Sequence, residues 1–305
     1  MPCDNVGNEH TLTVNRAGRV FAAGFNDSGQ CGRGNETETD ASTLQVVDAL
    51  TPASSVHASN GAEHSLVLLR DGRLAAFGCN ARGQLGSAGG QCAVPRFVAL
   101  GTRRVLHVAS SYHHTLVACE GAVFGFGRND VGQLGVGDFA ERTSPAPLES
   151  LRLKHVSSIS CGQYHSCAVS DGALMACGRN DYGQAGKGSE IGVVCVFTSV
   201  DEAAYESVAC GYYHAVAVRR DGRIVGFGRN DSGQLGFEKT VDAPAKSCIF
   251  GPRLLDPWHA SDKVATASCG SYHTAVVTTA GRCLVFGRNG HGQLGLGDHE
   301  DRFAP

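Results

Sequence analysis

Six histidines recur at regular intervals and are the first residues of this chain that could do chemistry. A histidine can act as a general base or as a metal ligand near neutral pH. Six equivalent copies do not make one catalytic site, however, so we expect hydrogen-bonded structural residues that open strands. Each stands 15 or 16 residues before an asparagine; they are His10, His64, His114, His165, His214 and His273.

The 13 cysteines offer thiol chemistry and metal ligation, but their number is odd and no two are spaced as C-x-x-C. Zinc ribbons and thiol redox motifs depend on that spacing. Cys161, Cys210 and Cys269 share one repeat position, and we interpret them as small buried side chains in a reducing compartment. The sequence therefore predicts no metal site and no bound cofactor.

Motifs of known enzyme classes are also missing. Gly290, Gly292 and Gly295 match the dinucleotide fingerprint G-x-G-x-x-G by letters, but no helix pattern follows them. The chain has no G-x-S-x-G, no G-x-x-x-x-G-K-[ST] and no H-E-x-x-H. We expect no catalytic residue and predict that the protein is not an enzyme.

The elements that position these residues follow from an internal repeat. The phrase G-x-N-x-x-G-Q occurs six times, which is typical of one structural unit copied along a chain. Its Asn, Gly and Gln residues suit a loop, because asparagine and glycine accept backbone angles that other residues avoid. The asparagines are Asn26, Asn80, Asn129, Asn180, Asn230 and Asn289.

Each repeat reads as about four short strands. In the fourth copy, two apolar runs flank Asp171-Gly172, a strong hairpin signal that requires positive φ at both central positions. A four-stranded sheet of this size does not bury both faces by itself, whereas radial packing of copies does. The sequence thus predicts an all-β fold, a β-propeller; an open solenoid is the alternative.

The repeats run without a linker, so we expect residues 1–305 to form a single propeller domain of six repeats of about 50 residues. The chain starts at the strand before His10 and stops where the connector strands of a sixth unit begin. Either six blades close with residues 1–6 standing in for a missing strand, or the chain is part of a seven-bladed ring. We favour six blades.

Charge and hydropathy narrow the range of partners. The formal net charge is −3 and no block of five like charges occurs, so we expect neither nucleic acid nor an acidic membrane as partner. No stretch approaches the ~20 apolar residues of a membrane span, and no signal region precedes the first repeat. We expect a cytoplasmic or nuclear protein that is not secreted.

The order G-x-x-H-[TS]-x-x-[VL], turn, G-x-[NR]-x-x-G-Q-L-G resembles the repeat of the regulator of chromosome condensation family over nearly the whole chain. The resemblance implies a β-propeller, usually of seven blades closed by strands from both termini. It also implies several unrelated functions: a nucleotide exchange factor for the GTPase Ran, a plant ultraviolet-B photoreceptor, and binding modules of ubiquitin ligases.

The photoreceptor function does not fit these residues. The resemblance places tryptophans two residues before the repeat histidine and arginines one before. The only tryptophan here, Trp258, lies elsewhere. The residues two before the histidines are Asn8, Ala62, Tyr112, Gln163, Tyr212 and Ser271.

The exchange-factor function implies a loop wedge in one blade that displaces the nucleotide. The longest connector runs from Gln234 to His273, 39 residues against 30 to 34 elsewhere, and holds residues 239–246 and 250–253. A plain loop insertion explains the same length, because surface loops lengthen cheaply. The basic N-terminal tail of the chromatin-bound member is missing, which argues against nucleosome docking.

The positions that vary within the motif are the candidate partner-binding residues. Those directly before the histidines are Glu9, Glu63, His113, Tyr164, Tyr213 and Tyr272. Those flanking the loop asparagines are Arg128, Arg179, Arg229, Arg288, Asp130, Asp181 and Asp231. Tyrosine is enriched at binding hot spots, and charges of both signs can set the register of a partner. The alternatives are tyrosines that cover blade edges and ion pairs between neighbouring blades.

The sequence therefore predicts a non-enzymatic protein-interaction propeller whose tyrosines bind a protein or peptide. The alternative is a guanine nucleotide exchange factor for a Ran-like small GTPase.

Overall fold

The computed structural model describes residues 4–6, 10–34, 41–50, 55–201, 203–237, 248–255 and 262–305. The chain divides into two compact units. The first comprises Met1–Asp130 and Asp138–Leu153, and the second comprises Val131–Gly137 and Lys154–Pro305. Within the described ranges, no helix has the length and apolar character needed to span a bilayer.

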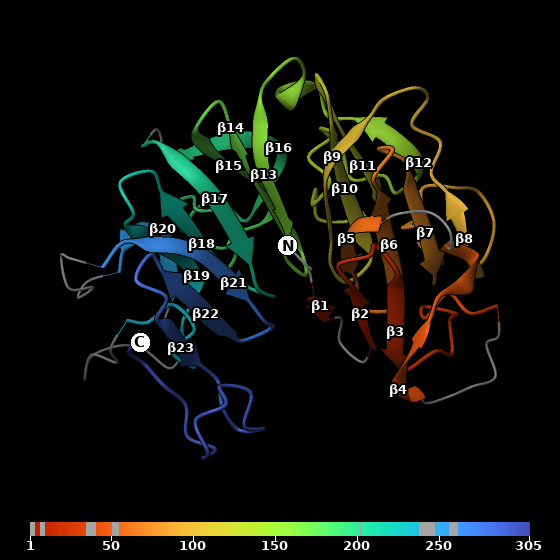
Figure 1. Cartoon of the computed structure of the whole chain (residues 1–305). Coiled ribbons are helices and arrows are strands. Elements are labelled where there is room, and N and C mark those ends of the chain that lie inside the picture. The colour runs from red at the N-terminus through yellow and green to blue at the C-terminus, as the bar shows by residue number, and fades with distance from the viewer. Residues whose placement is uncertain are drawn as a thin grey trace. The chain divides into compact units, whose positions relative to one another are not determined.

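The first unit holds three four-stranded antiparallel sheets, or blades (Figure 1). The first blade is β1 (Asp4–Val6), β2 (His10–Val14), β3 (Val20–Gly24) and β4 (Ala41–Val46). The second is β5 (Ser55–Asn60), β6 (His64–Leu69), β7 (Leu74–Gly78) and β8 (Cys92–Phe97). The third is β9 (Val105–Ser110), β10 (His114–Cys119), β11 (Ala122–Gly127) and β12 (Arg142–Pro147). Two 3₁₀ helices complete the unit: η1 (Asp48–Leu50) and η2 (Glu149–Leu151).

The second unit holds two four-stranded blades and one three-stranded blade. The fourth blade is β13 (Val156–Cys161), β14 (His165–Ser170), β15 (Ala173–Arg179) and β16 (Val193–Asp201). The fifth is β17 (Tyr205–Cys210), β18 (His214–Arg219), β19 (Ile224–Arg229) and β20 (Cys248–Leu254). The sixth is β21 (Val264–Cys269), β22 (His273–Thr278) and β23 (Cys283–Gly287).

The predicted all-β propeller of about four-stranded blades is confirmed, with one blade for each of the six repeats. Of residues 1–6, Asp4–Val6 form β1, which pairs with β2 and supplies the first strand of the first blade. In the sixth blade, the place of a fourth strand is marked by a single antiparallel bridge between Gly287 and Arg302. The single-domain assignment stays a prediction.

The hairpin turns agree with the sequence in only one repeat. Asp171 and Gly172 have φ of 52° and 84°, as the predicted turn requires. In the other five repeats the glycine alone has positive φ. At Gly18, for example, the amide donates to Asn15 O and the Asn15 amide donates to Arg19 O, which is the pattern of a longer loop closed by a glycine bulge.

The repeated histidines join neighbouring blades through a hydroxyl. His10 Nε2 lies 2.8 Å from Ser65 Oγ, which itself donates to Gln30 O at 2.8 Å. The same chain links His214, Thr274 and Gln234 in the second unit, at 3.1 and 2.7 Å. The predicted structural role is confirmed for these histidines, which are buried and open their strands.

The motif asparagine and glutamine close the loop that follows the third strand. Asn80 Oδ1 accepts the Leu85 amide at 2.9 Å, and Gln84 Oε1 accepts the Arg82 amide at 2.8 Å. Both side chains are buried. Their structural role, expected from the repeat, is confirmed.

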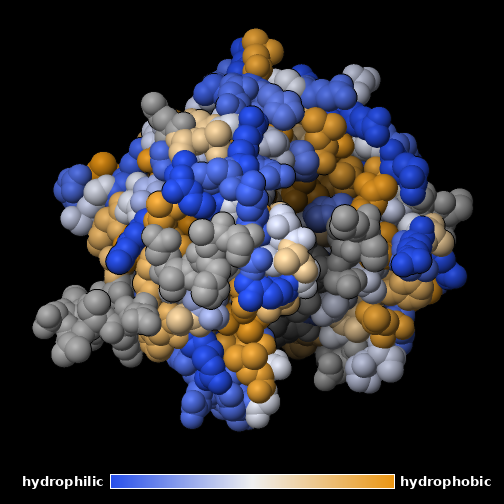
Figure 2. Space-filling view, turned by 60° about the vertical axis from the view of Figure 1, so that its left-hand side comes forward, coloured by the Kyte–Doolittle hydropathy of each residue, from blue (hydrophilic) through white to orange (hydrophobic). Residues whose placement is uncertain are grey.

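Hydrophobic clusters fill the space between adjacent blades of each unit. Phe77 lies between the first and second blades and Phe126 between the second and third. Phe227 lies between the fourth and fifth, and Phe286 between the fifth and sixth. Figure 2 shows hydrophilic and hydrophobic residues interspersed on the face that it draws.

Candidate partner-binding site

Tyr164, Tyr213 and Tyr272 come together because each directly precedes the histidine that opens the second strand of its blade. Their carbonyls hold the start of the motif loop: Tyr164 O accepts the amide of Arg179, at 2.8 Å. Tyr213 and Tyr272 accept the amides of Arg229 and Arg288 at the same distance. The repeat therefore places one tyrosine beside one arginine in three consecutive blades.

The three rings form a continuous row in the second unit. The Tyr164 and Tyr213 centroids lie 6.1 Å apart and those of Tyr213 and Tyr272 lie 6.2 Å apart, with interplanar angles of 32° and 34°. All three side chains are partly exposed. The row agrees with the sequence expectation that these positions lie next to one another.

Two further tyrosines join this row and were not among the predicted site residues. Tyr182 packs edge-on against Tyr213 at 5.4 Å, and Tyr212 packs edge-on against Tyr272 at 5.7 Å. Tyr182 follows the motif asparagine by two residues and Tyr212 precedes its histidine by two, so their registers were readable, but not their side-chain directions. We call Tyr164, Tyr182, Tyr212, Tyr213 and Tyr272 the tyrosine cluster.

Arginines lie over the faces of these rings. The Arg229 guanidinium is 5.3, 5.7 and 5.8 Å from the centroids of Tyr182, Tyr213 and Tyr272. Arg179 lies 5.5 Å from Tyr164 and Arg288 lies 5.9 Å from Tyr272. A guanidinium within about 6 Å of a ring centroid is attracted by the ring's quadrupole, so the arginines hold the aromatic row in place.

The alternative of ion pairs between neighbouring blades is wrong for Arg179 and Arg229. These arginines pair instead with the aspartate two residues further along their own loops: Arg179 with Asp181 at 2.7 Å and Arg229 with Asp231 at 2.5 Å. The loop turns at the intervening asparagine, whose side chain is buried, so its neighbours point outwards together. These pairs are partly exposed and contribute only ~0–1 kcal/mol each.

Arg288 is the exception among the loop arginines. Gly290 stands where the other three arginine-bearing loops have aspartate, and among the described residues no acidic side chain lies within ion-pair distance of Arg288. Arg288 is exposed at the edge of the tyrosine cluster. A carboxylate of a partner could therefore form an ion pair with the Arg288 guanidinium, which no described acidic side chain neutralises.

The environment of Tyr213 shows how closely the cluster packs. Burial, together with the neighbouring Tyr272 and Tyr164 hydroxyls, raises the pKa of Tyr213 to about 12. Arg179 acts in the opposite direction. The ring remains neutral at physiological pH and keeps its hydroxyl as a donor.

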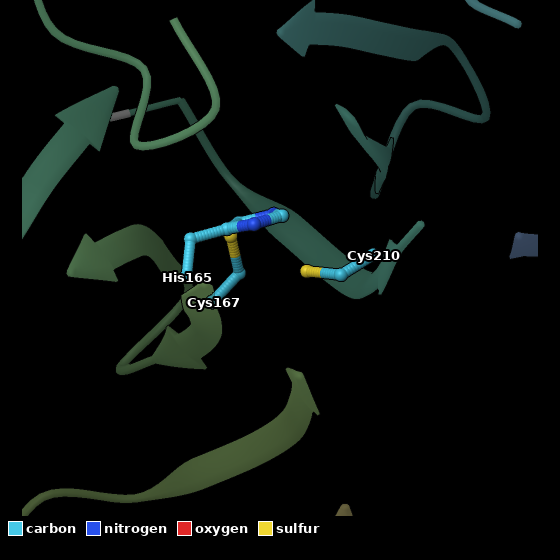
Figure 3. A group of neighbouring side chains, drawn as sticks. All are labelled: His165, Cys167 and Cys210. Carbon is cyan, nitrogen blue, oxygen red and sulfur yellow. The ribbon is translucent and has the colours of Figure 1, made fainter. Parts of the chain in front are cut away.

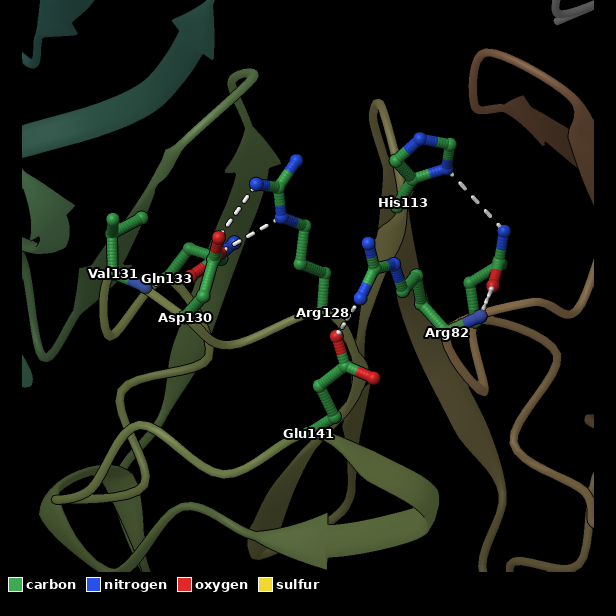
Figure 4. A network of polar contacts seen from close by, with 8 residues as sticks. Arg82, His113, Arg128, Asp130, Val131, Gln133 and Glu141 are labelled. Carbon is green, nitrogen blue, oxygen red and sulfur yellow. Dashed lines mark hydrogen bonds and ion pairs between the residues drawn. The ribbon is translucent and has the colours of Figure 1, made fainter.

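His113, Arg128 and Asp130 belong to the first unit and form a group of their own (Figure 4). Arg128 binds Asp130 through two hydrogen bonds of 2.8 and 2.6 Å. Nearby, Arg82 pairs with Glu141 at 2.8 Å.

The His113 ring contacts Gln84, which belongs to the same group of polar residues. Its Nδ1 is 3.5 Å from Gln84 Nε2. Burial is the main reason that the pKa of His113 is lowered. These charges are largely satisfied by one another, so the tyrosine cluster is the stronger candidate surface.

Some predicted features fall elsewhere. Glu9, Asn8 and Trp258 lie outside the described residues, as do residues 239–246 of the longest connector. The interpretation of residues 250–253 as part of a wedge is wrong, because they lie in β20 and pair with β19. β20 is the outer strand of its blade, equivalent to β16 in the fourth blade.

Comparison with known proteins agrees with this architecture. A family model described as an RCC1-like domain matches residues 5–305. The ultraviolet-B receptor UVR8 of Arabidopsis thaliana is 30% identical over 306 residues, covering 98% of this chain and 68% of the receptor. The probable E3 ubiquitin-protein ligase HERC6 of Homo sapiens is 34% identical over 262 residues, covering 83% of this chain. The chain spans only 25% of that ligase's length.

Two solved structures share the fold. Human WBSCR16 superposes with a TM-score of 0.88 at 23% identity, covering 99% of this chain and 80% of that one. Prp20p from Saccharomyces cerevisiae superposes with a TM-score of 0.85 at 24% identity, covering 99% and 75%. At these identities the likeness concerns the fold alone.

Proposed function

This chain belongs to the RCC1-like domain family, and on that premise we propose that it is a non-enzymatic propeller that binds a protein or peptide partner. The observation that carries the proposal is the tyrosine cluster in the second unit. Five partly exposed tyrosines touch one another and are held by arginines. Tyrosine and arginine are the residue types that dominate binding energy at protein interfaces.

The chemistry of the cluster favours a partner segment that combines apolar or aromatic side chains with carboxylates. The ring faces offer apolar area with polar edges. Arg288 offers a charge with no described acidic partner. Packing within the cluster orders these side chains in advance, which lowers the entropy lost on binding.

The absence of enzyme motifs from the sequence supports a non-enzymatic role. For compartment, we propose the cytoplasm or the nucleus, because most of the described cysteines are small buried side chains, as is usual in reducing compartments. Fractionation of cells that express the tagged chain tests this placement.

The function is tested by changing Tyr164, Tyr213 and Tyr272 together to alanine. We expect the wild-type chain to capture a partner from native extract, and the purified partner to bind the triple variant at least tenfold more weakly. The matched control changes three exposed apolar residues outside the cluster, Phe97, Phe139 and Leu153, to alanine. Equal affinity of the wild type and the tyrosine variant, both folded by circular dichroism, would refute the proposal.

A nucleotide exchange factor for a Ran-like GTPase is the second candidate. This chain shares the fold of Prp20p, whose crystal structure has been described together with its binding properties to Gsp1p and histones. An exchange factor needs no nucleophile, because it works by binding the nucleotide-free GTPase more tightly than the loaded one. The lack of catalytic motifs is therefore compatible with this function as well.

Release of fluorescent GDP from a panel of small GTPases separates the two candidates. Acceleration of at least tenfold, which corresponds to about 1.4 kcal/mol in the barrier, supports exchange. A partner that binds the tyrosine cluster without any acceleration supports the interaction module alone.

A further inference from the structure

One of the hydrogen-bonded links between blades is interrupted in the second unit. In the other described links a serine or threonine follows the next repeat's histidine and accepts from the preceding blade, as Ser65 and Thr274 do. At the contact of the fourth and fifth blades this position is Ala215, which is fully buried and has no hydroxyl. His165 therefore lacks the partner that its equivalents have.

His165 is left with two ring nitrogens that make no hydrogen bond. The side chain is 0% exposed, and neither Nδ1 nor Nε2 has a partner among the described residues. In His10, His64 and His214 only Nδ1 is unpaired, because Nε2 reaches a hydroxyl. An unpaired buried polar group destabilises the folded state, so a chain that keeps one calls for an explanation.

Two thiols lie where the hydroxyl is missing. The ligand atoms of His165, Cys167 and Cys210 all fall within 4.8 Å of one another. Figure 3 shows the Cys210 sulfur pointing towards the His165 ring and the Cys167 sulfur. Cys167 and Cys210 come from adjacent blades, on β14 and β17.

The Cys167 thiol is specific to this contact, whereas Cys210 shares its repeat position with Cys161 and Cys269. The residue two after the histidine is aliphatic in every other repeat; the equivalents of Cys167 are Leu12, Leu66, Leu116, Val216 and Ala275. A thiol at this position is therefore not required for packing a blade.

We propose that His165, Cys167 and Cys210 bind a thiophilic cation such as Zn²⁺, which joins the fourth and fifth blades where the hydroxyl is missing. Two thiolates and one imidazole are a ligand set that zinc accepts, with a fourth position left for water or another ligand. Tetrahedral bonds of about 2.0–2.3 Å place ligand atoms roughly 3.5–3.8 Å apart. A contraction of about 1 Å from the present spacing satisfies this geometry.

Zn²⁺ binds the deprotonated thiolates, so it displaces the thiol protons when it enters the site. The site escaped the sequence analysis because its ligands come from two repeats and have no C-x-x-C spacing.

The test uses the full chain, reduced and stripped with a chelator, and titrates it with Co²⁺ and then with Zn²⁺ in competition with a chromophoric chelator. We expect one equivalent of Co²⁺ to give thiolate-to-cobalt charge-transfer bands, which Zn²⁺ abolishes. Cys167→Val, which introduces the residue type found at Val216, and Cys210→Ser should each weaken Zn²⁺ binding more than about 100-fold. Cys119→Ala, a buried thiol of the first unit, should leave binding unchanged.

Ala215→Ser is the most discriminating variant, because it retains all three ligands. Its hydroxyl should form a hydrogen bond with His165 Nε2, as Ser65 Oγ does with His10 Nε2. This bond should weaken Zn²⁺ binding at least tenfold. It should also raise the melting temperature of the metal-free chain. Zn²⁺ should also protect Cys167 and Cys210 from alkylation in the native protein, which remains measurable if a cysteine variant fails to fold. Absence of charge-transfer bands, or bands that persist in both cysteine variants, would overturn the proposal.

Discussion

At the residue scale, the tyrosine cluster depends on what surrounds Tyr213. This ring touches Tyr164, Tyr182, Tyr212 and Tyr272, and Arg229 lies 5.7 Å from its centroid. Edge-on and tilted aromatic pairs add about 0.5–1.5 kcal/mol each beyond the area that they bury. Tyr213 is therefore the position at which a substitution disturbs the whole cluster.

Alkaline titration tests that environment. Tyr213 should ionise near pH 12, about two units later than an exposed tyrosine. Because the folded-state pKa lies above the unfolded one, folding stability falls as the pH rises from about 10 towards 12. Tyrosinate absorbance should show one fewer late-titrating group in Tyr213→Phe than in the wild type. Identical titration curves would mean that the ring is exposed to solvent.

At the element scale, the motif loop of one blade docks on the outer strand of the next. A Cβ built at Gly183 meets Ile249 O, on β20 of the fifth blade, at 2.5 Å. Its φ is +80°, so two requirements, backbone conformation and space, both select glycine. The equivalent Gly292 in the sixth blade has φ of +73°, but its nearest neighbour, His299, is 3.6 Å away.

These two glycines form a matched pair of substitutions. Gly292→Ala should destabilise folding by about 1–2 kcal/mol, the penalty of left-handed backbone alone. Gly183→Ala should destabilise it by a further 1–3 kcal/mol, because the methyl group must displace β20. Urea unfolding of the two variants measures the difference. Equal destabilisation would show that the loop does not press on the next blade.

At the scale of the whole molecule, the repeated histidines make stability depend on acid. Burial lowers the pKa of His10 to about 4 and that of His214 to about 3, and it also lowers that of His64. The unfolded chain takes up protons at these residues below about pH 6.5, whereas the folded chain does not. Stability is therefore present above this pH and is lost as the pH falls towards 4.

Urea unfolding at pH 7.5 and pH 5.5 measures this effect before most carboxylates titrate. His10 and His214 should each contribute about 1.4 kcal/mol of lost stability at pH 5.5, or about 3 kcal/mol together, and His64 acts in the same direction. Replacing His10 by glutamine should reduce the pH dependence by one such increment. A midpoint that does not change between the two pH values would contradict the burial of these rings in the folded state.

The sequence by itself determined the strands, the six repeats and the structural role of the motif residues. These depend on short-range bonds at a constant spacing, such as Asn180 Oδ1 accepting the Ala185 amide five residues on, at 3.1 Å. Because the spacing of these residues repeats six times, the sequence alone predicts that they form the same local structure in every repeat. It also placed Tyr164, Tyr213 and Tyr272 at one repeat position, and hence in one row.

Only the tertiary structure decided which side chains face one another across blades. Tyr182 and Tyr212 join the cluster, Arg229 pairs within its own loop, and Cys167 meets Cys210, because side-chain direction depends on packing and not on spacing. The sequence shows that Ala215 lacks a hydroxyl. Only the structure shows that His165 is left without a hydrogen-bond partner as a result. Contacts between side chains of different blades join residues that are distant in the sequence, so they leave no local pattern to read.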